Sequence, residues 1–77
     1  MTEVRVLIVE DEALVADAHR DYVERVEGFV VVGVAETVQE AVRALAHQPV
    51  DLVLLDLNLP DGSGLEVLQG VRAAGRP

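Results

Sequence analysis

The sequence predicts an α/β fold with a parallel β-sheet, and two observations support this prediction. Three runs dominated by aliphatic residues, at 4–9, 30–35 and 50–55, alternate along the chain with segments whose apolar residues recur at the helical period. The first run is apolar almost throughout, as is typical of a strand that is covered on both faces. Because the connections are short, we expect parallel strands with right-handed crossovers.

The first strand, VRVLIV at residues 4–9, ends at the acidic residues Glu10, Asp11 and Glu12. A helix is predicted to follow and to end near Gly28. Its apolar residues fall on one face, which an amphipathic pattern assigns to the core. The residues on this face are Leu14, Val15, Ala18, Tyr22 and Val26.

The second strand is predicted at VVVGVA, residues 30–35, and a second helix follows it. Thr37 and Glu40 have the spacing of a capping box, which marks the start of that helix. Pro49 is expected to end it, because proline disfavours helical geometry in the preceding residue, Gln48. The predicted buried stripe of this helix consists of Val38, Ala41, Val42 and Leu45.

The third strand is predicted at VDLVLL, residues 50–55, and it runs directly into Asp56. The segment LPDGSG that follows has the composition of a turn. A second capping box, Ser63 with Glu66, predicts a third helix that ends before Gly75. The residues expected to face inward on this helix are Leu65, Leu68 and Val71.

Length and composition exclude several classes of function. A chain of 77 residues allows one small domain at most, and such a core is marginal because a short chain buries only about 60% of its unfolded surface, so a portion of the domain could be missing. The absence of cysteine excludes a disulfide framework and a thiol nucleophile. Without a signal peptide or an apolar run of the ~20 residues that span a bilayer, we expect a cytoplasmic protein that does not enter the membrane.

The net charge of −8 argues against nucleic acid or anionic lipid as a partner of this segment, since such binding depends on lysine and arginine. A negative chain is suited to binding a cation. Ligands of open parallel sheets bind beyond the carboxyl ends of the strands. If the first and third strands are neighbours, Glu10, Asp11 and Asp56 converge there, and the backbone carbonyl of Asn58 lies close by. Mg2+ prefers such oxygen ligands and would neutralise their charge.

Simpler interpretations compete for each of these residues. Acidic residues at a helix start complement the helix dipole, which is sufficient for Glu12 and is as good an explanation as a metal for Glu10 and Asp11. Asp56 could begin a turn, but Asp61 is available for the turn, so we favour a functional role for Asp56. The remaining candidates for chemistry are interpreted as structural: His19 and His47 as exposed helical residues, and Ser63 as a helix cap.

Two segments, VLIVEDE and VDLVLLDLNLPDGSGLEVL, resemble the receiver domain of two-component response regulators. That resemblance implies the flavodoxin-like, or CheY-like, fold with strand order 2-1-3-4-5, of which this chain would contain the first three strands in the order 2-1-3. The segments RDYVERVEGFVVVGVAET and LPDGSGLEVL are similar to regulators of the citrate and C4-dicarboxylate group.

The resemblance also implies a role for each site residue. Asp56 would accept a phosphoryl group from a sensor histidine kinase. Asp11 and Asp56 would ligate Mg2+ directly together with the Asn58 carbonyl, and Glu10 would hold the metal through water. In the intact protein the phosphorylated domain would switch an output, which we expect to be transcription.

Residues 1–77 would correspond to the N-terminal portion of a receiver domain, with the fourth strand and everything after it absent. The family carries a phosphate-contacting Ser or Thr and a Lys on those later strands. The third strand would then have an unpaired apolar edge, and we expect the chain to form a homodimer or a swapped oligomer.

Two alternative functions remain at this point. Haloacid-dehalogenase-type phosphatases also place an aspartate nucleophile at a strand end beside Mg2+, but they require a second aspartate two residues later, where this chain has Asn58. The chain is therefore not expected to be an enzyme. The other alternative is a receiver-like interaction module that is never phosphorylated.

Overall fold

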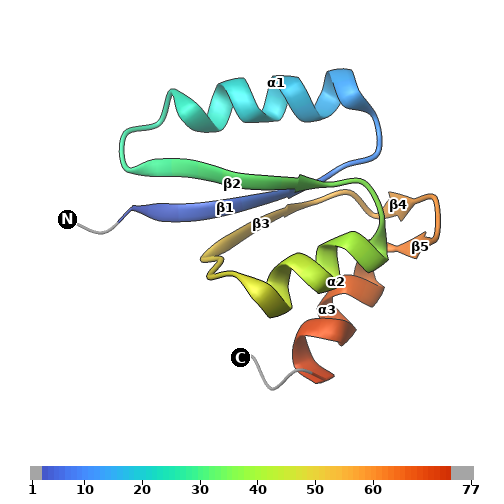
Figure 1. Ribbon diagram of the computed structural model, residues 1–77. Helices are drawn as coiled ribbons and strands as arrows, with labels where there is room; N and C mark the ends of the chain where they lie inside the picture. The colour runs from blue at the N-terminus through green and yellow to red at the C-terminus, as the bar shows by residue number, and fades with distance from the viewer. Residues whose placement is uncertain (1–2, 74–77) are drawn as a thin grey trace.

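The structure, a computed structural model, describes residues 3–73, with side chains described up to residue 70. Its elements are β1 (Val4–Val9), α1 (Ala13–Glu24), β2 (Phe29–Ala35), α2 (Val38–His47), β3 (Leu52–Leu55), β4 (Asn58–Leu59), β5 (Gly62–Ser63) and α3 (Gly64–Ala73). The main sheet is parallel with strand order β2-β1-β3, which confirms the predicted α/β class and the predicted order. Helix α1 covers one face of this sheet, and α2 and α3 cover the other (Figure 1).

The central strand β1 divides the core into two clusters because its side chains alternate between the two faces. Val6 and Ile8 pack toward α1, whereas Leu7 and Val9 pack toward α2 and α3. All four side chains are buried. This burial on both faces explains why the first apolar run of the sequence lacks polar alternation.

The predicted buried face of α1 is wrong. The helix buries Ala16 and Val23, two turns apart, whereas Leu14 and Tyr22 are 85% and 72% exposed. The buried stripe of α1 is therefore narrow. The apolar residues on either side of this stripe are not covered by any of the residues described here. The helix also ends earlier than predicted, at Glu24, and Gly28 instead forms the turn into β2 with a positive φ of 87°.

Helix α2 follows its sequence signals closely. The Thr37 hydroxyl accepts the backbone N–H of Glu40 at 3.0 Å, as the capping box predicts. The Glu40 carboxylate returns to the N–H of Glu36, one residue before the expected position. Ala41 and Leu45 are buried, and the chain leaves helical geometry at Gln48.

The region after β3 differs from the prediction in two respects. The predicted turn is a short antiparallel hairpin of β4 and β5, in which Asn58 pairs with Ser63. On α3 the inward residue is Val67, which is 1% exposed, whereas Leu65 and Leu68 are 58% and 50% exposed. This helix has apolar residues on several sides, so its sequence alone does not show which side is buried. The packing of Leu59 and Leu45 around Val67 selects the buried side. The predicted inward residue Val71 and the predicted end at Gly75 lie outside the described side chains and the described chain, respectively.

Candidate metal centre at the carboxyl ends of β1 and β3

The neighbouring strands β1 and β3 end at the same level of the sheet. Val9 is in register with Leu55, so the next residues, Glu10 and Asp56, emerge side by side. Two backbone hydrogen bonds extend the ladder beyond the strand ends: Asp56 N–H donates to the Val9 carbonyl at 3.0 Å, and Glu10 N–H donates to the Ala35 carbonyl at 2.9 Å. The backbone under the site is therefore held by the sheet itself.

Three carboxylates meet at this edge. Each of Glu10, Asp11 and Asp56 offers an oxygen that lies within 4.8 Å of the others. Glu10 is only 9% exposed, Asp56 is half-buried and Asp11 is exposed. Within residues 3–70, the ion pair that is formed joins Arg5 to Asp51, so no basic side chain described here neutralises the cluster.

The chemistry of these donors fits Mg2+. Like charges about 5 Å apart repel by roughly 1 kcal/mol per pair in a water-like dielectric, and by more where they are partly buried. A divalent cation removes this repulsion, and carboxylate and carbonyl oxygens are the ligands that Mg2+ takes. The structure thus brings together the three predicted carboxylates, while their role as ligands stays a prediction.

The structure also supports the simpler interpretation that an acidic residue after β1 helps to start α1. The Glu10 carboxylate accepts the backbone N–H of Glu12 at 3.3 Å, so it helps to begin α1. The Glu12 side chain, which we expected to serve the helix start, makes no capping hydrogen bond. Glu10 therefore serves both the helix and the acidic cluster.

Contrary to the prediction from the sequence, Asp56 takes part in turn chemistry. One oxygen of Asp56, Oδ1, accepts the N–H of Asn58 at 3.1 Å, which is an Asx turn. Asp61, to which we had assigned that role, instead accepts two N–H groups at the start of α2, from Val38 at 2.7 Å and from Gln39 at 3.1 Å. Asp56 therefore shapes its own loop and also faces the acidic cluster.

The contact of Asp61 with α2 has an electrostatic signature. The N–H of Val38 is the main cause that holds the pKa of the Asp61 carboxyl below its ordinary value of 3.8. Desolvation, the next largest effect, raises this pKa, and the N–H of Gln39 adds to the lowering. Because the pKa is lowered in the folded state, the contact stabilises the fold above pH 3.8, and this contribution is lost as the pH falls through the lowered value.

Gly64 is a second residue whose role the sequence analysis missed. A Cβ atom built at this position would collide with the backbone carbonyl oxygen of Asp56 and lie 3.0 Å from Cγ of Leu55. The first residue of α3 therefore has to be glycine for the helix to approach the strand end. The available signal was the glycine itself, which is a poor helix former placed at a helix start.

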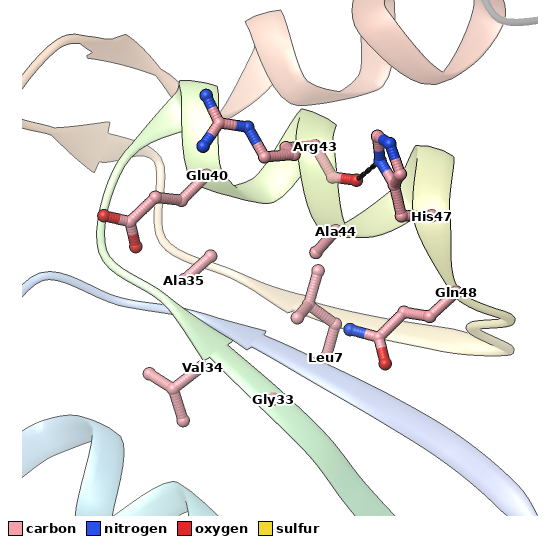
Figure 2. Close-up of a pocket in the computed structure, with 9 residues that line it drawn as sticks. All are labelled: Leu7, Gly33, Val34, Ala35, Glu40, Arg43, Ala44, His47 and Gln48. Atoms are coloured by element: carbon pink, nitrogen blue, oxygen red, sulfur yellow. Dashed lines mark hydrogen bonds between the residues drawn. The ribbon is translucent and has the colours of Figure 1, made fainter.

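Two cavities lie on opposite faces of the sheet. One of about 360 Å³ lies between α2 and β2, and it includes none of the clustered carboxylates. Figure 2 shows its polar rim, where Nδ1 of His47 lies 2.9 Å from the carbonyl oxygen of Arg43. The other, of about 620 Å³, lies between α1 and β3 and extends from the acidic cluster at Glu10 and Asp56 over apolar side chains. His19 lines the second cavity, and both histidines are exposed, as predicted.

The helices of the described chain are too short or too polar to cross a bilayer.

Comparisons with known proteins agree on one family. Residues 6–77 match the family described as "Response regulator receiver domain". The probable C4-dicarboxylate response regulator DctR of Priestia megaterium is 41% identical over 71 residues, which cover 91% of this chain and 31% of that protein. The chain thus spans about a third of the length of this curated relative.

Solved structures agree with the sequence matches. A LuxR-family two-component response regulator from Aurantimonas sp. SI85-9A1 superposes with a TM-score of 0.88 at 32% identity, covering 94% of this chain and 51% of that one. The MaeR response regulator bound to beryllium trifluoride superposes with a TM-score of 0.85 at 37% identity, covering 95% of this chain and 60% of that one. The CheY-like arrangement expected from the sequence is confirmed.

Proposed function

Since this chain belongs to the receiver domain family of response regulators, we propose that Asp56 accepts a phosphoryl group from a sensor histidine kinase in the presence of Mg2+. The observation that carries this proposal is the convergence of Glu10, Asp11 and Asp56 within 4.8 Å. We also propose that residues 1–77 are the N-terminal portion of the receiver domain, which agrees with the greater length of the solved relatives.

The residues that would hold the metal are Asp11, Asp56 and the backbone carbonyl of Asn58, with Glu10 acting through water. Bound there, Mg2+ would neutralise the carboxylates and stabilise the charge on the phosphoryl oxygens. The chain's own contribution is to hold Asp56 rigidly at the strand end and to engage its Oδ1 with the N–H of Asn58. Its other oxygen, Oδ2, is the one we expect to react.

The transfer is a substitution at phosphorus. Oδ2 of Asp56 forms a bond to the phosphorus atom while the bond from phosphorus to the donor breaks, and the donor leaves as imidazole or, with acetyl phosphate, as acetate. The product is an acyl phosphate that carries about −1.5 to −2 charges beside Glu10 and Asp11. Beryllium trifluoride becomes tetrahedral when a carboxylate oxygen binds it, and it then resembles a phosphoryl group. The relative that is bound to this ion therefore supports such a site in this fold.

The wider function follows from the named relatives. One is a probable C4-dicarboxylate response regulator, and another, from Bacillus subtilis, is the transcriptional regulatory protein MalR. We propose that the intact protein acts in the cytoplasm and regulates transcription in response to a small carboxylic acid. This segment would not bind nucleic acid itself, because its net charge is −8. Asn58 argues against the phosphatase alternative, since an amide cannot serve as a general acid.

The test is incubation of the chain with acetyl phosphate, followed by measurement of its intact mass. With Mg2+ we expect a fraction of the chains to gain one phosphoryl group, which hydroxylamine should remove, as it does from acyl phosphates. The modification should be slow, because the phosphate-contacting Ser or Thr and the Lys of the family lie on later strands. With a chelator in place of Mg2+ we expect no gain. Equal modification without Mg2+ would contradict the proposed role of the metal. A chain that stays unmodified with Mg2+ would contradict the proposed phosphorylation and favour the interaction module that is never phosphorylated.

A second copy of the chain is a further proposed partner. Within residues 3–73, β3 pairs with β1 on one side and with no strand on the other, and its first residue, Leu52, is 40% exposed. An apolar strand edge of this kind favours pairing. Sedimentation equilibrium of the 77-residue chain is expected to reveal a concentration-dependent dimer that Leu52→Lys weakens. Leu68→Lys, a matched change at a 50% exposed leucine of α3, should leave the dimer intact. A monomeric wild-type chain would exclude this pairing.

A further inference from the structure

Asp61 connects two segments of the chain that are distant in sequence. It lies in the turn between β4 and β5, and its two carboxylate oxygens accept the N–H groups of Val38 and Gln39, 23 and 22 residues earlier. These are the first two residues of α2, whose N–H groups have no acceptor within the helix. Figure 1 places the β4–β5 hairpin next to this end of α2.

Helix α2 does not depend on Asp61 alone for its start. The Thr37 hydroxyl caps the N–H of Glu40 from within the same segment. Asp61 thus adds a second contact to the start of α2, from outside the helix. Because the helix already has its own cap, this contact matters mainly for the position of the hairpin. Strands of two residues are too short to fix a hairpin by their own pairing.

The hairpin carries Asn58, whose carbonyl is a proposed metal ligand. Several contacts hold the segment around Asn58. Its N–H donates to Asp56, and the carbonyl of the preceding residue, Leu57, accepts the N–H of Gly64 at 3.1 Å. The next residue, Leu59, is buried in the core at 9% exposure. These contacts act on residues 57–59, at the base of the hairpin. At the other end of the hairpin, Asp61 fastens the turn to α2, and the N–H of Ser63 donates to the Glu66 carboxylate of α3 at 3.3 Å.

We propose that Asp61 is a positioning residue for the metal site. Its carboxylate holds the β4–β5 hairpin against α2 and thereby keeps in place Asn58, whose N–H donates to Asp56 and whose carbonyl is the proposed ligand. This inference rests on the proposed Mg2+ site. It assigns to Asp61 a function beyond the helix cap, because the loss of a cap alone would weaken α2 without moving Asn58.

The test compares two variants that each remove a cap from the same helix. Asp61→Ala removes the long-range anchor, and Thr37→Ala removes the local one. We expect both to lower the melting temperature, but only Asp61→Ala to weaken Mg2+ binding in a calorimetric titration, by about tenfold, as for other residues that orient a metal ligand. Asp61→Asn, which keeps one acceptor oxygen, should recover some of the affinity.

Amide hydrogen exchange without metal gives a readout that is independent of Mg2+. Asp61→Ala should speed exchange at the N–H groups of Asn58 and Gly64, which bond to Asp56 and Leu57, and Thr37→Ala should not. If the wild-type chain binds no Mg2+, the proposed function fails and so does the metal-positioning role. If the wild type binds Mg2+ but Asp61→Ala keeps its affinity and its slow exchange, the inference fails alone.

Discussion

Replacing Asp56 with asparagine is expected to abolish phosphoryl incorporation from acetyl phosphate and to leave the fold intact. The amide cannot act as the nucleophile, so intact mass should show no phosphoryl group even with saturating Mg2+. The loop should survive, because the asparagine side-chain oxygen can still accept the N–H of Asn58, as Oδ1 of Asp56 does at 3.1 Å. The loss of phosphorylation would therefore be a chemical effect and not a consequence of unfolding.

The same substitution should make the metal-free protein more stable. It removes one of three clustered negative charges and therefore two repulsive pairs, each worth roughly 1 kcal/mol in a water-like dielectric. Urea unfolding in the presence of a chelator should show a gain in the free energy of unfolding of about 2 kcal/mol. A gain in stability together with a loss of function is the expected behaviour of a site that holds like charges together for a ligand.

A matched control lies at the other end of the same strand. Asp51 precedes β3 and accepts the N–H of Arg5 at 2.9 Å, far from the acidic cluster. Asp51→Asn changes the net charge by the same amount, and it should leave phosphorylation unchanged. Persistent phosphorylation of Asp56→Asn would place the acceptor at another residue.

The features of the fold that could be predicted are those that depend on local sequence. Apolar runs set the strands, so the residues that interrupt them, Glu10 and Asp56, mark the strand ends where ligands bind. The capping box of Thr37 and Glu40 set the start of α2 because both partners lie within one helical turn. Each of these signals lies within a few residues of the feature that it predicts.

The features that could not be predicted depend on residues that are distant in sequence. Helix α1 has apolar residues on more than one side, and only its contact with the sheet selects Ala16 and Val23 for burial. Asp61 looks like an ordinary turn residue until α2, 22 residues earlier, is placed beside it. A local sequence pattern does not encode such contacts, which explains why these assignments were wrong.

Gly64→Ala is expected to destabilise the fold and to disrupt the metal site, although alanine is the better helix former. Helix propensity alone favours alanine by about 1 kcal/mol. The added methyl group, however, would overlap the carbonyl oxygen of Asp56 and lie 3.0 Å from Cγ of Leu55. Backbone cannot yield as a flexible side chain does, so α3 or the strand end must shift, at a cost of about 1–3 kcal/mol.

The displaced atom belongs to the proposed phosphoryl acceptor itself, so Mg2+ affinity and phosphorylation should fall together with stability. Gly33→Ala, the same chemical change in β2, is the matched control. Its new methyl group would meet Leu7 at an ordinary 3.5 Å, and the lower entropy of the unfolded chain should make it neutral or stabilising by about 0.5 kcal/mol. Urea unfolding measures the stability of both variants, and calorimetric titration measures their affinity for Mg2+. If Gly64→Ala were as stable as Gly33→Ala and kept its affinity for Mg2+, the prediction would be wrong. The close approach of α3 to Asp56 would then not explain the glycine at position 64.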